Sequence, residues 1–164
     1  MHKLFTGLCV TLLSIQSVAM DKDHYKSHHH RSNSFVTVEV EGLVLSNFRA
    51  RSSIGQIKNS SAYGEIQSNT TDRLIQASSS VAAVVEVHEH VNDNGLMRMR
   101  KVEGGLALEE NQSIIMKPGG YHIMLINLHK PLKAGDTMDL SLKFGSGKLI
   151  ELSIPVVSIK KSHH

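Results

Sequence analysis

The sequence has little of the chemistry on which many enzymes and nucleic-acid-binding proteins depend. Its 164 residues include one Cys, three Pro, three Tyr, four Phe and no Trp. So few aromatic side chains argue against a surface on which nucleic-acid bases stack. The formal charge is +3, and acidic and basic residues are mixed along the chain without a block of Lys or Arg. Neither composition nor charge therefore indicates a nucleic-acid partner.

The first 19 residues have the layout of a secretory signal peptide. A short basic start, residues 1–3, precedes the apolar run LFTGLCVTLLSIQSVA. Ser17 and Ala19 then place small residues at the −3 and −1 positions of a cut before Met20. We predict export, with cleavage after Ala19. The run is short and interrupted by Thr, Ser and Gln, so it is a poor membrane span, and an integral membrane protein is not expected. A buried N-terminal helix is the alternative.

The only cysteine, Cys9, lies inside that apolar run and has no lipobox around it. We therefore expect no lipid anchor, and removal of the signal peptide leaves a mature chain without cysteine. Such a chain forms no disulfide, so its stability must come from core packing. It also offers no thiol nucleophile and no thiolate metal ligand.

Composition divides the mature chain into three parts. Residues 20–34 are polar and rich in His, which predicts a flexible leader. Residues 35–159 hold nearly all of the patterned apolar sequence and form the predicted domain. Residues 160–164 are a polar tail that ends in two His. Apolar residues make up 40% of the chain, which is enough for one core and too few for a membrane protein.

The predicted domain consists of short β-strands. Apolar and polar residues alternate over residues 35–45, 63–67, 74–77, 84–90, 96–102, 113–117, 121–128, 138–144 and 148–157. Turn sequences rich in Gly and Asn separate them at 92–95, 103–105, 118–120, 133–136 and 145–147. Many short strands at close spacing predict a single all-β domain, an antiparallel β-sandwich or barrel.

A hairpin that carries both His and Met is predicted around NDNG, residues 92–95. If all four residues form the loop, His90 faces Met97 and His88 faces Met99 across the ladder. A two-residue turn at the last two positions instead pairs His90 with Met99. In either register the His and Met side chains share one face, because strand residues two apart point to the same side.

A second His/Met pair, His122 and Met124, follows the Gly-Gly turn in PGGYHIMLINL. Alternation puts both side chains on one face of their strand, roughly 6.5–7 Å apart. In the hairpin, alternation likewise adds Glu86 to the face of the histidines. Thioether sulfur is soft and uncharged and selects Cu(I) over Zn(II), Mg(II) or Ca(II), and neutral imidazole suits Cu(I) as well. Two strands that each present His and Met on one face thus predict a Cu(I) site.

Each of these residues taken alone has a plainer interpretation. A Met in a strand is more often a core residue than a ligand, and we expect Met116 and Met138 to be core residues. A lone His in a strand is usually structural or exposed. Arg98, Arg100 and Lys101 are expected on the face opposite the Met residues, as a solvated surface, with the steering of an acidic partner as the alternative.

Four motifs, MRMR, VEGG, KPGGYHIML and LKAGD, occur in this order between residues 97 and 136. They make residues 36–157 resemble the periplasmic copper chaperones of the PCu(A)C family. The resemblance implies a cupredoxin-like (Ig-like) β-sandwich without the blue-copper cysteine, with a Cu(I) site near one end. The ligand pattern of the family falls, in this chain, on His88, Met99, His122 and Met124.

The chain departs from the family at His90, where members usually have Met, and at residues 50–56, which lack the usual Trp and Pro-rich turn. His90 and Met97 are secondary metal candidates. The His-rich ends form another candidate, for Cu(II), because clustered imidazoles bind this ion with little selectivity. A solvated polar tail is the alternative. The residues concerned are His24, His28, His29, His30, His163 and His164.

The resemblance implies a periplasmic carrier that delivers Cu(I) to the dinuclear copper site of cytochrome oxidase, directly or with Sco-type proteins. The expected partner is a copper-accepting protein, either the oxidase copper subunit or a Sco-type protein, with no small-molecule substrate. The alternatives are a copper-buffering or tolerance protein and a metal-independent β-sandwich binding module. An enzyme is not expected, because the sequence has no nucleophile elbow and no evident acid/base pair.

Overall fold

The computed structural model of the chain describes residues 37–158. The predicted signal peptide, most of the domain's flanks and both His-rich ends lie outside these residues, so the boundaries at residues 19, 34 and 159 stay predictions. All regular structure in the described part is β-strand. No helix in it is long and apolar enough to cross a membrane.

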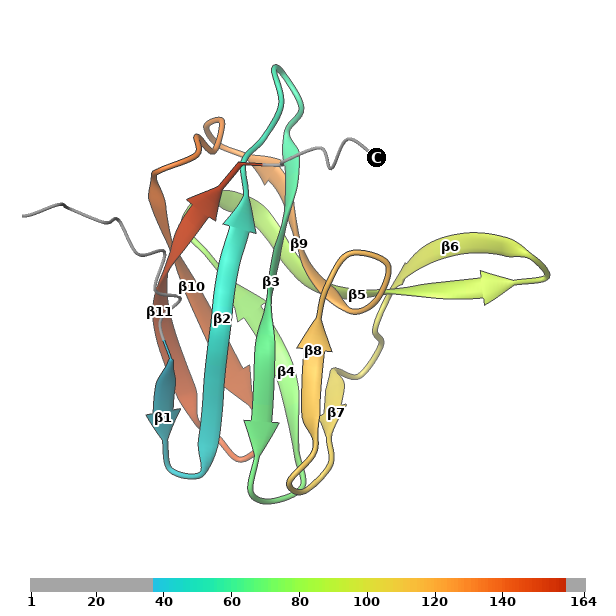
Figure 1. Cartoon of the computed structure of the whole chain (residues 1–164), viewed down its shortest axis with the longest axis vertical. Coiled ribbons are helices and arrows are strands. Elements are labelled where there is room, and N and C mark those ends of the chain that lie inside the picture. Colours follow the sequence, from blue (N-terminus) through green and yellow to red (C-terminus); the bar gives the residue numbers. More distant parts are fainter. Residues whose placement is uncertain (1–36, 159–164) are drawn as a thin grey trace, which may run out of the picture. The chain divides into compact units, whose positions relative to one another are not determined.

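Eleven strands make up the described domain (Figure 1). In chain order they are β1 (Val38–Val40), β2 (Leu43–Arg51), β3 (Asn59–Ser68), β4 (Asp72–Ser78), β5 (Ala82–Asp93), β6 (Leu96–Lys101), β7 (Leu106–Leu108), β8 (Ser113–Met116), β9 (His122–Leu128), β10 (Thr137–Phe144) and β11 (Leu149–Val157).

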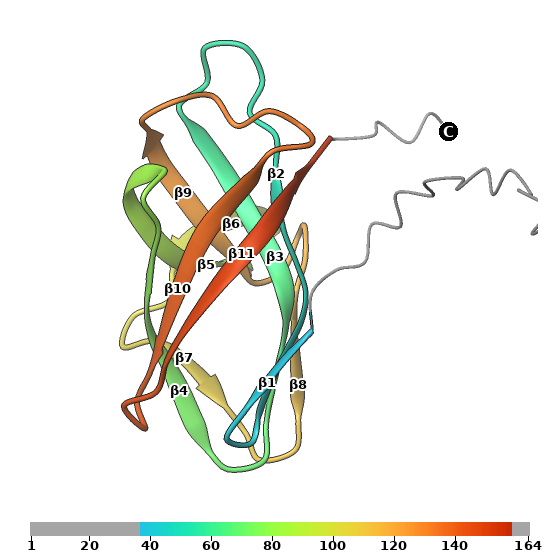
Figure 2. The same ribbon diagram turned by 90° about the vertical axis from the view of Figure 1, so that its left-hand side faces the viewer.

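The strands fold into two facing layers (Figure 2). Hydrogen-bonded neighbours follow the order β6-β5-β9-β3-β2-β11-β10-β4-β7, while β1 adds to β2 and β8 adds to β3. Strand β11 joins the layers, because it pairs antiparallel with β10 and parallel with β2 at Val156–Ala50. The all-β sandwich is confirmed. The purely antiparallel pairing is wrong at this junction, where β11 runs parallel to β2, and at the isolated parallel bridge between Ser68 and Glu110.

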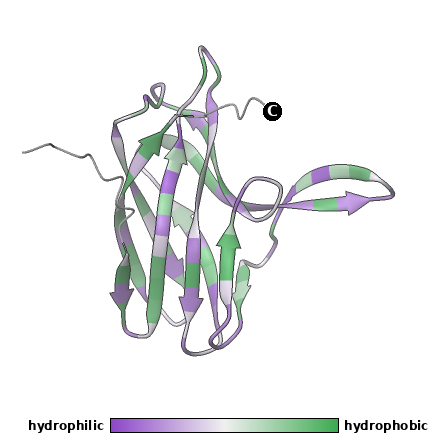
Figure 3. Cartoon of the chain, in the orientation of Figure 1, coloured by the Kyte–Doolittle hydropathy of each residue, from purple (hydrophilic) through white to green (hydrophobic). Residues whose placement is uncertain are grey.

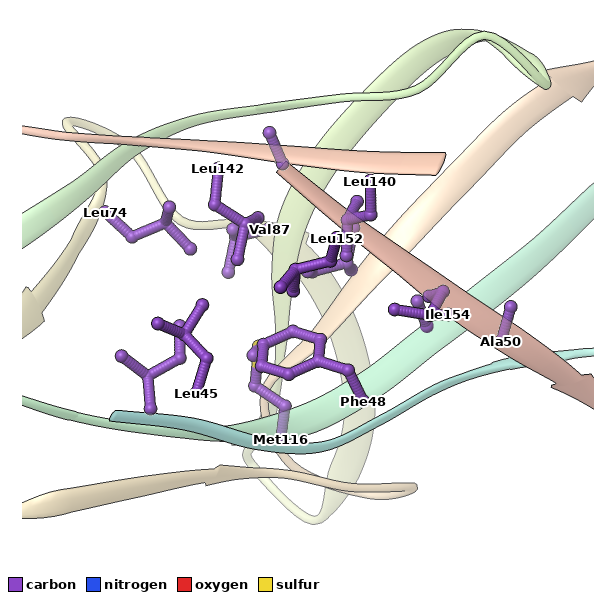
Figure 4. Packing of buried hydrophobic residues seen from close by; sticks show 14 of the residues in the cluster. Leu45, Phe48, Ala50, Leu74, Val87, Met116, Leu140, Leu142, Leu152 and Ile154 are labelled. Carbon is purple, nitrogen blue, oxygen red and sulfur yellow. The ribbon is translucent and has the colours of Figure 1, made fainter. Parts of the chain in front are cut away.

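The core lies between the layers and is built by alternation along the strands. In β10 the side chains of Met138, Leu140, Leu142 and Phe144 point inward and are at most 4% exposed. Figure 4 shows Leu140 and Leu142 facing Phe48 of β2 and Met116 of β8 across the interior. Met116 and Met138 are therefore core residues, as predicted.

The strands differ in places from the pattern read from the sequence, most clearly at residues 35–45 and at β7. Residues 35–45 were expected as one run, but the chain turns at Glu41 and Gly42, whose φ angles are +47° and +84°. The run is thus split between β1 and β2. Strand β7 was not predicted, because three residues are too few for an alternation pattern to be recognised.

Strand β5 leaves the body of the domain halfway along its length. Residues Ala82–His88 pair with β9, and residues 88–93 pair with β6. Beyond His88 the β5–β6 hairpin pairs with no third strand, and it projects from the sandwich (Figure 1). We call residues 88–101 the arm. Hydrophobic and hydrophilic residues are interspersed along it (Figure 3).

Candidate metal centre

The hairpin turn at the tip of the arm consists of two residues, Asn94 and Gly95. Their φ angles are +53° and +86°, which fits a two-residue hairpin turn of the type that Asn-Gly favours. Gly95 N–H also donates to Asn92 Oδ1 at 2.8 Å. His90 consequently pairs with Met99. The register with a four-residue loop is wrong, and the two-residue alternative is confirmed.

Strand β9 brings the second His/Met pair alongside the arm. His88 is the Cα partner of His122, and Glu86 is the partner of Met124. Opposed residues of an antiparallel ladder share a face. The three strands β6, β5 and β9 therefore present one continuous face. Its residues are Glu86, His88, His90, Met97, Met99, Lys101, His122 and Met124.

His122 is the buried centre of this face. Its side chain is 3% exposed, and its two ring nitrogens have different neighbours. Nδ1 lies 2.9 Å from the carbonyl oxygen of Gly120, and Nε2 lies 2.9 Å from Sδ of Met99. The PGG turn before β9 thus supplies the oxygen that orients the ring, and the arm supplies the sulfur.

The two neighbours determine where His122 carries its proton. A carbonyl oxygen only accepts hydrogen bonds, so Nδ1 must be the N–H that donates to Gly120. In the neutral ring Nε2 then carries a lone pair, and this lone pair faces the lone pairs of Met99 sulfur. Nε2 of His122 and Sδ of Met99 are thus two electron-pair donors that face one another with no proton between them, and such a pair is suited to bind one cation.

Burial keeps this ring neutral. Desolvation lowers the pKa of His122 below its usual value, and the nearby His90 and His88 rings lower it further, against the opposing effect of the Gly120 hydrogen bond. Metal ions bind the neutral imidazole, not the imidazolium. The environment of His122 therefore favours its metal-binding form.

His88 lies next to His122, with ring centroids 6.1 Å apart. Its Nε2 is 2.9 Å from Oε2 of Glu86, while its Nδ1 is buried without a hydrogen-bond partner. The other carboxylate oxygen of Glu86 accepts from Lys101 Nζ at 3.0 Å. The hydrogen bond from His88 lowers the pKa of Glu86 most, and the hydrogen bond from Lys101 lowers it further.

His90 is the third imidazole on this face. Its ring centroid is 5.0 Å from that of His122, and its Nδ1 is 3.4 Å from the Gly120 oxygen. Met97 lies further out on the arm, paired with Asn92, and is 61% exposed. The structure thus brings His90 to the cluster and leaves Met97 near the arm's tip.

Met124 shares the face but has its own neighbour. Its sulfur accepts a hydrogen bond from Ser61 Oγ at 3.6 Å, and its side chain lines a hollow formed with residues 51–54, 57 and 59–61. It pairs with Glu86, one step along the ladder from His88 and His122. Of the four predicted ligands, His88, Met99 and His122 are clustered, and Met124 lies beside them with its sulfur on Ser61.

The arm also corrects the expected position of Lys101. This residue is two positions from Met99, so it lies on the same face and not on the opposite one, and it binds Glu86 there. Arg98 and Arg100 lie on the opposite face as predicted, paired with Asp93 at 3.0 Å and Glu89 at 2.9 Å. Alternation placed Glu86 beside the histidines, but it gave no sign of its bond to Lys101.

Comparison with known proteins places the chain. Residues 43–156 match the family model described as "Putative lipoprotein LpqE-like". The chain belongs to this family. It is 32% identical over 97 residues to the "Putative lipoprotein Lxx21020" of Leifsonia xyli subsp. xyli, and 32% identical over 92 residues to the "Uncharacterized protein RP573" of Rickettsia prowazekii. These alignments cover 58% and 55% of this chain, and 58% and 51% of the relatives.

Solved structures of PCuAC domains share the fold of this LpqE-like domain. The apo domain from PmoF1 and the copper-bound domain from PmoF2 each superpose with a TM-score of 0.63 and cover 75% of the chain. Their identities are 20% and 18%, and 99% and 98% of their own lengths are covered. The Cu(I) form of DR1885 from Deinococcus radiodurans has a TM-score of 0.59 at 21% identity, covering 71% of this chain and 78% of that one.

Proposed function

We propose that this domain is a copper chaperone that binds one Cu(I) ion through His88, Met99, His122 and Met124 and passes it to another protein. The observation that carries the proposal is the contact between His122 Nε2 and Met99 Sδ at 2.9 Å. The Gly120 hydrogen bond leaves a lone pair on that nitrogen. A soft nitrogen–sulfur pair with no proton between its atoms favours a soft cation.

The donor set favours copper in its monovalent state. Within residues 37–158, no group of three or more His, Cys, Asp or Glu side chains could hold a metal ion. Thioether sulfur is available on this face from Met99 and Met124, and it selects Cu(I) over the harder divalent ions. The imidazoles and thioethers are neutral, so the ligands add no negative charge that would favour Cu(II).

The position of Met99 suits transfer. Its side chain is 48% exposed at the base of the arm, whereas His122 beneath it is 3% exposed. Metal–ligand bonds of roughly 2.0–2.3 Å, as in zinc sites, require that the sulfur swing outward when an ion enters. An exposed, unbranched Met can make this movement, and an incoming ligand from a partner can reach the ion from the same side.

Similar proteins support copper as the cargo and export as the location. Copper-bound forms of two proteins with this fold are known, and the descriptions of the family and of one relative both read "Putative lipoprotein". We infer an exported protein that acts in the periplasm as a non-enzymatic carrier, with the copper subunit of cytochrome oxidase or a Sco-type protein as acceptor. A deletion strain should then lose oxidase activity at low copper and regain it when copper is added.

A competition titration tests the site. The mature protein should withdraw one equivalent of Cu(I) from a chromogenic chelator. Met99→Leu removes the sulfur but keeps the side-chain volume, and it should weaken binding at least about tenfold, or about 1.4 kcal/mol.

Met97→Leu is the matched control, since Met97 lies two residues away on the same face and pairs with Asn92, away from His122. It should bind as the wild type does. If Met99→Leu and Met124→Leu both bound Cu(I) with wild-type affinity, the proposed set of ligands would be excluded.

A further inference from the structure

The two ring nitrogens of His88 have unequal surroundings. Nε2 lies 2.9 Å from the Glu86 carboxylate, and Nδ1 is buried with no hydrogen-bond partner. The side chain is 15% exposed. A buried polar atom without a partner costs free energy and needs an explanation, and one recognised explanation is a ligand that binds there.

The Glu86 carboxylate determines the tautomer of this ring. An ionised carboxylate only accepts hydrogen bonds, so Nε2 must carry the proton that lies between them. In the neutral ring the lone pair is then on Nδ1, the buried atom without a partner. The alternative tautomer would set a lone pair against the carboxylate and bury an unpaired N–H.

The neighbouring rings have the opposite tautomer. Nδ1 of His122 and Nδ1 of His90 both face the carbonyl oxygen of Gly120, at 2.9 and 3.4 Å. Their protons are therefore on Nδ1, and their lone pairs are on Nε2. His88 differs from them because its neighbour is a side-chain carboxylate on the same strand and not the carbonyl of the turn before β9.

Lys101 completes the arrangement from the strand opposite. It is the ladder partner of His88, and its Nζ lies 3.0 Å from Oε1 of Glu86, the oxygen that His88 does not use. Both carboxylate oxygens are thus engaged, one by each neighbour. Lys101 therefore keeps Glu86 ionised and oriented toward His88.

We propose that Glu86, held by Lys101, is a positioning residue that fixes the proton of His88 on Nε2 and thereby assigns Nδ1 as its copper-binding nitrogen. This inference rests on the proposed function, and it adds that His88 and His122 bind the ion through different ring atoms. Partners behind a metal-binding His fix its tautomer and orientation, and their loss typically weakens metal binding about 10–100-fold.

Nitrogen NMR of the histidine rings tests the assignment directly. In the metal-free protein, His88 should show its proton on Nε2, and His122 should show its proton on Nδ1. His88→Ala and His122→Ala identify the two sets of signals. Addition of one equivalent of Cu(I), which is diamagnetic, should shift Nδ1 of His88 and Nε2 of His122 most. A shift centred on Nε2 of His88 would overturn the assignment.

Variants separate positioning from folding. Glu86→Ala should lower Cu(I) affinity about 10–100-fold and leave His88 as a mixture of tautomers. Glu86→Gln keeps an acceptor oxygen and should retain the tautomer and most of the affinity. Glu89→Ala is the matched control. Glu89 lies on the same strand as Glu86 but on the opposite face, where it pairs with Arg100 of β6, so the variant should bind copper normally.

The outcomes distinguish this inference from the proposed function. Wild-type affinity in Glu86→Ala, with wild-type protein binding Cu(I), would overturn the positioning role alone. Absence of Cu(I) binding by the wild type would overturn the proposed function and this inference with it. If Glu86→Ala lowers the thermal midpoint, Glu86→Gln replaces it as the test of the positioning role. Loss of both the His88 tautomer and the Cu(I) affinity in a stably folded Glu86→Gln protein would count against that role.

Discussion

At the scale of single residues, hydrogen-bond partners decide which atoms can meet a metal ion. The Gly120 oxygen leaves a lone pair on Nε2 of His122, and the Glu86 carboxylate leaves one on Nδ1 of His88. Met99 brings sulfur to the first of these at 2.9 Å. Alternation placed Glu86 and Met99 on the face of the histidines, but it does not orient the imidazole rings or show which atoms meet.

Burial of His122 predicts a pH dependence of the metal-free protein. Its pKa is lowered in the folded state, whereas an unfolded His has a pKa of about 6.5. Below that pH the unfolded chain takes up a proton that the folded ring resists, so the free energy of unfolding should fall as pH drops through about 6.5 and on toward the folded pKa. Above about pH 7 both states are neutral, and this contribution is constant.

Urea unfolding at pH 7.5 and 5.5 measures the effect. His122→Asn keeps a donor for Gly120 but cannot become charged, so the variant should lose less stability between the two pH values than the wild type does. An equal loss in both proteins would mean that His122 does not carry this dependence.

At the scale of elements, the arm determines which residues meet. The two-residue turn at Asn94-Gly95 pairs His90 with Met99, and the pairing of β5 with β9 sets His88 beside His122. Turn chemistry predicted the hairpin and the shared face from sequence. It left two registers open, since both put the same side chains on one face, and only the left-handed φ angles at the turn select between them.

The two layers of the sandwich could likewise be predicted only in part from the sequence. Alternation located most strands, because one face of each is buried, as in β10 and β11. The path that joins them was not predictable, since β11 pairs in parallel with β2 and this contact is distant in sequence. Alternation and turn residues predicted an all-β sandwich or barrel, and the PCu(A)C resemblance implied the sandwich. The pairing of β5 with β9, which joins the two His/Met pairs on one face, was not predicted.

A turn substitution should separate the arm from the body. Gly95 has φ +86° with open space around it, and a β-branched residue there costs about 1–3 kcal/mol in backbone strain. Gly95→Val should speed amide hydrogen exchange in β6 and weaken Cu(I) binding, because Met99 is no longer held in register. The free energy of unfolding of the body should change little.

Gly147 provides the matched control. It lies in the turn between β10 and β11 with φ +91°, and it also has open space around it. Gly147→Val should destabilise the body and leave Cu(I) affinity unchanged. The account of the arm would be wrong if the two variants affected copper binding equally.

At the scale of the whole molecule, the core and the site are separate. The core between the layers is apolar and, in the described residues, holds no cysteine that could form a disulfide. The metal-binding side chains lie on the other face of β9 from the core residues Ile123 and Leu125, where the arm begins. The domain can therefore fold without copper, and copper adds stability only by binding the folded state, about 2.7 kcal/mol at a free concentration 100 times the dissociation constant.

The most direct measurement is X-ray absorption at the copper edge on the mature protein loaded with one equivalent of Cu(I). We expect a copper coordination shell of both nitrogen and sulfur, with one sulfur fewer in Met99→Leu and an unchanged shell in Met97→Leu. A shell without sulfur, or one that Met99→Leu leaves intact, would contradict this expectation.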